Sequence, residues 1–264
     1  MSTGGETSKH GIWHEDLPRV VERARTLGLV VRGLHAHIGS GSDLENLARV
    51  GTAIRRLVPS VADTLTTVSA GGGLPIPYRA GEPRLDVARF TNGWRETKAA
   101  IERDLVRRIS LEVEPGRYLV AEAGALLTEV RATKRSGGVD YVLVDAGFHN
   151  LIRPAMYGAY HHISVVGRGA DEQATPKVVA GPLCESADVF TQDREGNLAP
   201  QPLPAVREGD LLCIHDAGAY AASMASSYNS QPIAAEVLVE DGRARLVRRR
   251  QRVEDVFRDE ADLG

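Results

Sequence analysis

The stretch Ser110-Leu111-Glu112-Val113-Glu114-Pro115-Gly116-Arg117 decides how the rest of the chain is interpreted. Alternating apolar residues predict a strand over 109–113. The following residues end it, because proline lacks a backbone donor and glycine permits unusual dihedral angles. A carboxylate and a guanidinium therefore lie at a strand end. Glu114 can accept a hydrogen bond from a protonated ring nitrogen, and Arg117 can bind a carboxylate or a phosphate. Alone, the stretch is equally consistent with a surface ion pair.

On the N-terminal side of this stretch, helical and strand patterns alternate. Apolar residues at helical spacing predict helices over 16–27, 44–57 and 87–105, and apolar runs predict strands over 30–37 and 65–69. Asp16 is expected to cap the first helix and Gly28 to end it. Three alternations imply parallel strands with right-handed crossovers. The glycine-rich and polar features follow the strand ends, where α/β barrels and open sheets place their active sites.

After Arg117 the pattern changes to short strands separated by Gly, Pro and Asp, which predicts an antiparallel β domain. The segments 167–176 and 192–209 are polar and contain proline, so they are predicted to be surface loops. The sequence therefore predicts an α/β plus β protein with domains at 1–118 and 119–264. The predicted strands of the second domain are 125–133, 141–145, 161–166, 178–180, 211–215, 235–239 and 244–248.

Composition excludes several classes of protein. The chain has 264 residues, 42% of them hydrophobic and 25% charged, which is ordinary for a globular protein. A net charge of -3 provides no field that would attract nucleic acid or a membrane surface, and no apolar run is long enough to span a membrane. Cys184 and Cys213 lack metal-site spacing, and the first dozen residues lack the apolar run of a signal peptide. We therefore expect a cytoplasmic protein.

Two strand ends carry candidate ligand-binding residues. His35 and His37 share one face of a strand, but no third metal ligand stands out, so no metal site is predicted. His37 can instead lie flat against an aromatic ligand, with Ser40 following a glycine that allows close backbone approach. The glycine triplet (Gly71, Gly72 and Gly73) can direct N–H groups at a phosphate, although such a triplet is most often only a turn.

The second half of the chain offers a thiol beside a carboxylate. Cys184 precedes Glu185 at an element boundary, which suits proton transfer; the alternative is an inert buried thiol, as expected for Cys213. Other candidates place a polar tip on an apolar or glycine-rich segment, where such groups are commonly satisfied core groups: Arg153, Tyr157 and Tyr220.

Together these segments resemble the diaminopimelate decarboxylase family, which belongs to the pyridoxal-phosphate decarboxylases of the alanine-racemase-like fold. The resemblance covers essentially the whole chain. It implies a partial (β/α)8 barrel over 1–118 that binds pyridoxal 5'-phosphate, followed by an antiparallel β-barrel or Greek-key domain over 119–264. The matching motifs, in the family's order, are residues 35–40, 71–74, 114–117, 145–147, 153–157, 181–185, 218–220 and 228–229.

The resemblance also implies a role for each candidate. His37 would stack on the cofactor ring and Glu114 would pair with the pyridine nitrogen. Cys184 would deliver a proton to the carbanion left when CO2 departs, from the second subunit of a homodimer. The other cofactor-binding residues would be Ser40, Gly71, Gly72, Gly73, Gly116, Arg117 and Tyr220. The substrate would be bound by Arg117, Arg153, Tyr157, Glu185 and Tyr220, with Glu185 at its ammonium group.

The implied reaction is decarboxylation of meso-2,6-diaminopimelate to L-lysine. Two departures, His149 and Gln231, are mild and remove no role. The family's Schiff-base lysine, however, lies on an early barrel strand, and none of Lys9, Lys98, Lys134 and Lys177 has that setting. We therefore expect a C-terminal portion of the enzyme with impaired activity by itself. The alternatives are a non-catalytic partner of a full-length homologue and a related ornithine or arginine decarboxylase.

Overall fold

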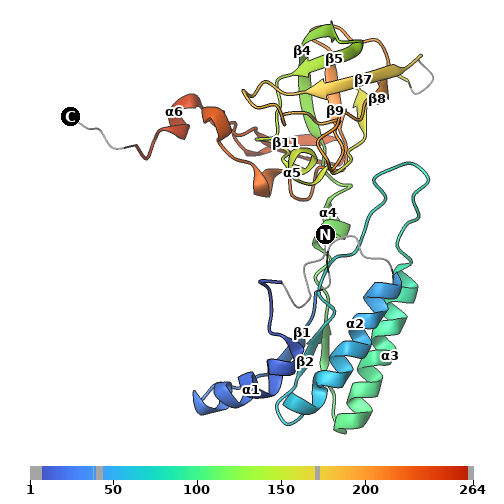
Figure 1. The fold of residues 1–264 in the computed structure, drawn as a ribbon, viewed down its shortest axis with the longest axis vertical. Coiled ribbons are helices and arrows are strands. Elements are labelled where there is room, and N and C mark those ends of the chain that lie inside the picture. Colours follow the sequence, from blue (N-terminus) through green and yellow to red (C-terminus); the bar gives the residue numbers. More distant parts are fainter. Residues whose placement is uncertain (1–7, 38, 40–43, 170–172, 261–264) are drawn as a thin grey trace. The chain divides into compact units, whose positions relative to one another are not determined.

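A computed structural model describes residues 8–37, 39, 44–169 and 173–260. The chain folds into two compact units (Figure 1). The first comprises Met1–Pro77 and Gly81–Leu119, and the second comprises Tyr78–Ala80 and Val120–Gly264. Among the described residues, no helix combines the length and apolar character that crossing a bilayer requires.

The first unit is built on a parallel sheet whose strand order is β1-β2-β3: β1 (Gly33–His35), β2 (Thr67–Ser69) and β3 (Ser110–Glu112). The helices α1 (Leu17–Thr26), α2 (Leu44–Leu57) and α3 (Val87–Leu105) alternate with these strands, and the short α4 (Gly116–Val120) follows β3. The predicted alternation and parallel pairing are confirmed. Because the strands are parallel, their C-terminal ends meet at one edge of the sheet.

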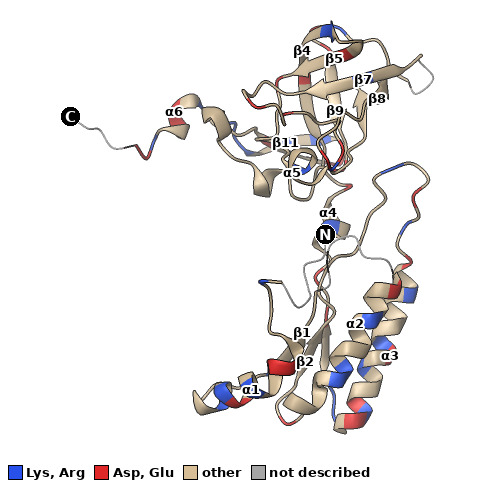
Figure 2. Ribbon diagram, viewed as in Figure 1, with Lys and Arg blue, Asp and Glu red and all other residues tan. Residues whose placement is uncertain are grey.

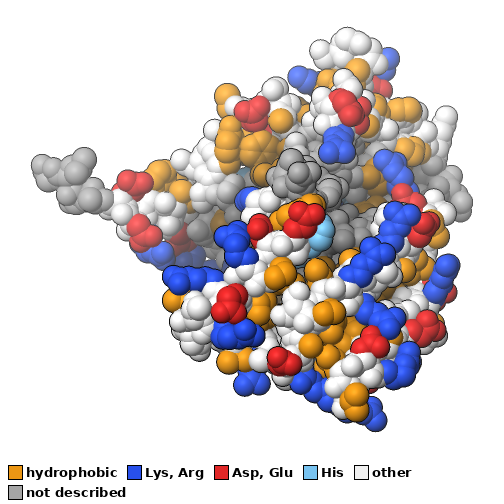
Figure 3. Space-filling model, turned by 60° about the horizontal axis from the view of Figure 1, so that its bottom comes forward, with side chains coloured by type: hydrophobic (Ala, Val, Ile, Leu, Met, Phe, Trp, Pro, Cys, Tyr) orange, Lys and Arg blue, Asp and Glu red, His pale blue; other side chains and the backbone are white. Residues whose placement is uncertain are grey.

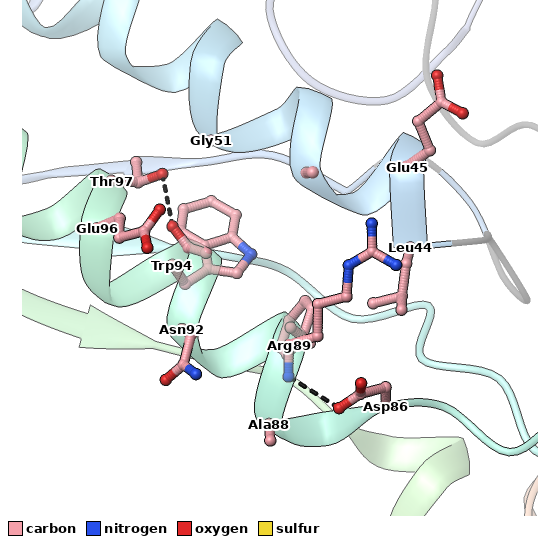
Figure 4. Close-up of a pocket in the computed structure, with 13 residues that line it drawn as sticks. Leu44, Glu45, Gly51, Asp86, Ala88, Arg89, Asn92, Trp94, Glu96 and Thr97 are labelled. Carbon is pink, nitrogen blue, oxygen red and sulfur yellow. Dashed lines mark hydrogen bonds between the residues drawn. The ribbon is translucent and has the colours of Figure 1, made fainter.

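The core of this unit lies between the sheet and the helices α2 and α3, which run side by side (Figure 1). Charged residues of both signs are interspersed along the helices (Figure 2). A groove of about 810 Å³ lies between α2 and α3, where the Asp86 carboxylate caps α3 by accepting the Arg89 N–H at 2.9 Å (Figure 4). The buried apolar side chains include Leu34, Leu47, Ile54, Leu65, Val68, Phe90, Trp94 and Ile101.

The first helix differs from its prediction in two ways. Asp16 makes no side-chain cap; its carboxylate accepts a hydrogen bond from Arg19 Nη2 at 3.0 Å instead. Leu27, predicted to face inward, is 57% exposed. Apolar spacing defines a face, but burial also requires a packing partner for that face. Figure 3 likewise shows hydrophobic side chains lying between charged ones at the surface. Gly28 ends the helix as predicted, at φ 74°.

The second unit contains a six-stranded sheet of order β6-β9-β4-β5-β7-β8 and a separate two-stranded ribbon, β10-β11. Its described residues also form two short helices, α5 (Arg153–Tyr157) and α6 (Val253–Val256), and the 3-10 turns Ala222–Met224 and Tyr228–Ser230. Its strands are β4 (Leu126–Ser136), β5 (Val139–Val144), β6 (Ile163–Val165), β7 (Thr175–Ala180), β8 (Gln201–Leu203), β9 (Leu211–Ile214), β10 (Glu236–Glu240) and β11 (Arg243–Arg248).

Two predictions for the second unit are wrong in part. Most pairings are antiparallel, but β5 and β7 pair in parallel, with Tyr141 opposite Val178. The segment predicted as a loop over 192–209 contains β8, in which Gln201 and Leu203 are buried. Pro202 argues against a strand when only the sequence is considered. Proline is nevertheless tolerated there because β8 is the edge strand of the sheet.

Backbone strain at the end of α3 can be tested by replacing Val106. It lies in the left-handed region, at φ 53°, and is 90% exposed. A β-branched residue there is strained by about 1–2 kcal/mol. Val106→Gly is therefore expected to raise the free energy of unfolding by about 1 kcal/mol, measured by urea denaturation. Val87→Gly, at the exposed first position of the same helix, is the control and should lower it. Equal or lower stability of Val106→Gly would refute the strain.

Candidate active site

The C-terminal edge of the parallel sheet brings three predicted segments together. His37 follows β1, the glycine triplet follows β2, and Glu114 follows β3. Backbone hydrogen bonds continue beyond the strands: Glu114 N–H donates to the Gly71 carbonyl at 2.8 Å. The structure thus places His37 and Glu114 on either side of the triplet. Ser40, the other candidate near His37, lies outside the described residues.

The glycine triplet is required by close contacts. Gly72 N–H donates to His37 Nδ1 at 3.1 Å, so Nδ1 is the acceptor and the ring proton lies on Nε2. A Cβ on Gly72 would lie 3.3 Å from His37 Cε1 and collide with the Glu114 carbonyl. Gly73 has φ 86°, and a Cβ there would collide with the Gly39 carbonyl. The absence of side chains keeps the backbone within reach of a ligand lying beside the imidazole.

Glu114 is oriented by a neighbour that the sequence analysis considered only as a metal ligand. His35 Nε2 lies 3.2 Å from Glu114 Oε2, and the two side chains are 48% and 57% exposed. Within the part of the chain that the structure describes, no group of three His, Cys, Asp or Glu residues is arranged to hold a metal ion. Gly116 is exposed at the start of α4, and Arg117 follows it, half-buried.

This arrangement fits a flat, phosphate-bearing heteroaromatic group. A glycine backbone at a strand end suits a phosphate because no side chain blocks its approach, the His37 imidazole offers a ring face, and Glu114 offers an acid for a ring nitrogen.

In the second unit, Cys184 is exposed on the loop after β7. Its backbone N–H donates to Asn229 Oδ1 at 3.0 Å. The neighbouring Glu185 carboxylate accepts hydrogen bonds from the Ala187 N–H at 3.3 Å and the Tyr228 hydroxyl at 3.2 Å. These bonds, that from Ala187 first, hold the pKa of Glu185 below its ordinary value. Glu185 is therefore an anion that can bind an ammonium group.

Asp188 anchors the same loop from the interior. The residue is 3% exposed, and its carboxylate accepts the N–H groups of Phe148 at 2.7 Å and Leu183 at 2.8 Å. Burial raises the pKa of Asp188, and the two backbone hydrogen bonds oppose that shift. A Cβ on Gly147 or Gly181 would collide with this carboxylate. Asp188 therefore ties the Cys184 loop to the turn after β5.

Arg153 begins α5 and is 5% exposed. Its Nη1 lies 2.7 Å from His161 Nε2, and His161 Nδ1 donates to the His215 carbonyl at 2.8 Å, so His161 is neutral and accepts from the arginine. The guanidinium carbon lies 5.0 Å from the centroid of the Tyr78 ring. His161 and Tyr78 were not among the sequence candidates. Together they fix the orientation of Arg153.

The remaining candidates lie near the surface of the second unit. Tyr157 ends α5 and is 36% exposed, and Tyr220 is 40% exposed at φ 63°. Gly218 packs so closely that a Cβ would collide with the Val120 carbonyl, and its N–H donates to the Ala121 carbonyl at 3.0 Å. This contact fixes the backbone that leads to Tyr220. The first unit thus carries His37, Gly71, Gly72, Gly73, Glu114, Gly116 and Arg117, and the second carries Arg153, Tyr157, Cys184, Glu185 and Tyr220.

The glycine triplet, the histidine and the acid at one sheet edge fit an enzyme that uses pyridoxal phosphate, in which an acid pairs with the pyridinium nitrogen. The chain belongs to the pyridoxal-dependent decarboxylases: the family model "Pyridoxal-dependent decarboxylase, C-terminal sheet domain" matches residues 35–218.

The individual relatives that the chain resembles are diaminopimelate decarboxylases. The chain is 49% identical over 260 residues to the diaminopimelate decarboxylase of Escherichia coli strain K12, covering 97% of this chain and 62% of that relative. A crystal structure of diaminopimelate decarboxylase is similar with a TM-score of 0.94 at 49% identity, again covering 97% and 62% of the two chains. The crystal structure of the Helicobacter pylori diaminopimelate decarboxylase complexed with L-lysine is similar with a TM-score of 0.85 at 31% identity. The match covers 97% of this chain and 61% of that one. The resemblance noted from the sequence is confirmed.

His149 provides a pH test of the second unit. It is 4% exposed, its Nδ1 has no hydrogen-bond partner among the residues that the structure describes, and burial lowers its pKa from the ordinary 6.5. The unfolded chain therefore binds a proton more readily, so this contribution to stability is present above pH 6.5 and is lost as pH falls through the folded pKa.

We expect the Tm of the native chain to fall more between about pH 7.5 and about pH 5 than the Tm of His149→Gln. His162, whose pKa is also lowered, is present in both chains, so the difference isolates His149. Exposed His10→Gln is the control and should behave as the native chain does. Parallel Tm curves for His149→Gln and the native chain would contradict the prediction.

Proposed function

We propose that this chain takes part in the pyridoxal-phosphate-dependent decarboxylation of meso-2,6-diaminopimelate to L-lysine. The observation that carries the proposal is the convergence of His37, the glycine triplet and Glu114 at one edge of a parallel sheet in a pyridoxal-dependent decarboxylase. In this proposal residues 1–118 are a partial (β/α)8 barrel and residues 119–264 an antiparallel β-barrel or Greek-key domain. The chain covers 62% of the length of the Escherichia coli relative.

The first unit would hold the cofactor. His37 supports one face of the ring, Glu114 keeps the proton on the ring nitrogen, and Arg117 adds positive charge. The phosphate is held by the glycine triplet, Ser40 and the backbone near Gly116. When bound, pyridoxal phosphate supplies an electron sink for the carbanion left by CO2.

The second unit, together with Arg117 of the first, would supply groups for the substrate. Arg117 and Arg153 bind carboxylates, Glu185 binds an ammonium group, and Tyr157 and Tyr220 complete the site. A substrate with two carboxylates suits two arginines better than ornithine or arginine, which have one each. The similarity of the chain to diaminopimelate decarboxylases also favours diaminopimelate over these two alternatives. Cys184 holds the proton that reaches the carbanion, acting across a homodimer. The two free thiols support a cytoplasmic location.

The test is CO2 release from meso-diaminopimelate, ornithine and arginine in the presence of pyridoxal phosphate. It is measured for this chain alone and for this chain completed with the part of the Escherichia coli relative that it does not cover. We expect the completed chain to act on meso-diaminopimelate, with kcat/KM at least about a hundredfold above that for the other two substrates. Preference for ornithine or arginine would overturn the proposed substrate. If neither form releases CO2 but this chain activates a full-length homologue, the role is that of a non-catalytic partner.

Mixing two variants of the completed chain tests the shared site. Cys184→Ala and Glu114→Ala should each be nearly inactive. If Cys184 serves the partner subunit's site, a mixed dimer regains one intact site, so random mixing should restore about a quarter of native activity. Cys213→Ala is the thiol control and should remain active. A mixture no more active than either variant would show that Cys184 acts within its own subunit or not at all.

A further inference from the structure

Two segments that are distant in the sequence contact the Cys184 loop, one at Phe148 and one at Tyr228 and Asn229. Tyr228 and Asn229 approach from one side, through the Tyr228 hydroxyl to Glu185 at 3.2 Å and Asn229 Oδ1 to the Cys184 N–H at 3.0 Å. Asp188 holds the loop from the interior by accepting the Leu183 N–H at 2.8 Å. We use the name Cys184 clamp for Tyr228 and Asn229 together.

The backbone of the clamp is unusual. Asn229 adopts φ 52° and ψ 32°, and Ser230 follows at φ 57°, so two successive non-glycine residues lie in the left-handed region. Asparagine tolerates this region better than most residues, but each such position still costs free energy. A strained backbone that persists at the surface indicates a role other than stability. The conformation places the Asn229 amide oxygen on the Cys184 N–H.

The clamp and the interior anchor are connected. The Tyr228 ring packs edge-on against Phe148, with ring centroids 4.8 Å apart and an interplanar angle of 63°. The Phe148 N–H in turn donates to the Asp188 carboxylate at 2.7 Å. The contacts therefore form a closed circuit from the Cys184 loop through Asp188, Phe148 and Tyr228 back to Glu185. Cys184 and Glu185 are fixed from both sides although the thiol is exposed.

We infer that Asn229 and Tyr228 are positioning residues, which fix the direction of the Cys184 thiol and of the Glu185 carboxylate. Asn229 acts on the residue that delivers the proton, and Tyr228 acts on the residue that binds the substrate ammonium. The reaction that this serves rests on the proposed function; the clamp itself rests on geometry alone.

If Tyr228 and Asn229 had a purely structural role, replacing them would lower the global stability of the second unit. Tyr228 is 40% exposed and Asn229 is exposed, so neither contributes much to a core. Hydrogen bonds at such a surface contribute little to global stability, because water replaces the lost partner. Removing the Asn229 oxygen should therefore loosen the loop without unfolding the second unit.

Amide hydrogen exchange of the full chain tests the clamp directly. Asn229→Ala should speed exchange of the Cys184 amide about fivefold to tenfold, because its acceptor is lost. Asn229→Asp retains the oxygen and should stay within about twofold of the native rate. The Phe148 amide, which donates to Asp188, is the internal reference and should not change. Unfolding curves identify any variant that fails to fold, and Asn229→Ser then serves as a milder replacement.

Kinetics of the completed chain separate the two residues. Asn229→Ala should lower kcat about tenfold with KM nearly unchanged, because proton delivery is affected and substrate binding is not. Tyr228→Phe should raise KM several-fold and leave kcat nearly unchanged, because Glu185 loses its donor. Rescue of kcat by Asn229→Asp supports positioning.

Two results would overturn the inference: native-like exchange of the Cys184 amide in Asn229→Ala, or equally fast exchange in Asn229→Asp. Failure of the native completed chain to release CO2 would count against the proposed function alone, since the exchange measurement needs no substrate.

Discussion

The hydrogen bond from the Glu114 N–H to the Gly71 carbonyl, 2.8 Å long, determines what the first unit can do. It extends the pairing of β2 and β3 past the ends of both strands, so the acid and the glycine triplet cannot move independently. The second tie, from the Gly72 N–H to His37 Nδ1, adds the end of β1. Both ties require glycine, because side chains there would collide with neighbouring backbone. The geometry of the candidate site therefore follows from parallel pairing, and three-residue strands suffice to supply it.

The second unit fixes the positions of its candidate residues in a different way. Its candidates lie on loops, and a loop needs polar partners for its backbone groups when it is held against a core. Asp188 supplies two acceptors from one buried carboxylate, and His161 supplies a neutral acceptor for the buried Arg153. Each of these polar groups is buried and hydrogen-bonded, so the desolvation cost is offset. The exposed side chains Cys184 and Tyr220 can then be placed by rigid backbone rather than by their own burial.

Local features of the sequence predicted local structure well. The bounds of α3, the end of α1 at Gly28 and the three strand-end clusters all follow from nearby residues. Prediction from the sequence failed where contact with a distant segment determines the local structure or its burial. Leu27 has the spacing of a buried residue but remains exposed, and β8 forms because Gln201 pairs with Lys177. Asp188 and His161 were not among the candidates for the same reason, and Asn229 was noted only as part of a matching motif, without a role. The one available signal was Asp188 itself, a charge beside the apolar pair Val189-Phe190.

Two carboxylates three residues apart illustrate how the fold assigns different tasks to similar groups. Glu185 is partly exposed and receives hydrogen bonds from Ala187, Tyr228 and Ser186, which lower its pKa, so it remains charged. Asp188 is buried, and burial raises its pKa despite two backbone donors. Burial and hydrogen bonding thus shift the same chemical group in opposite directions. The carboxylate with the lowered pKa is the partly exposed one, and the buried one holds the loop. Exchanging the two environments would raise the pKa of the partly exposed carboxylate and leave the loop without its anchor.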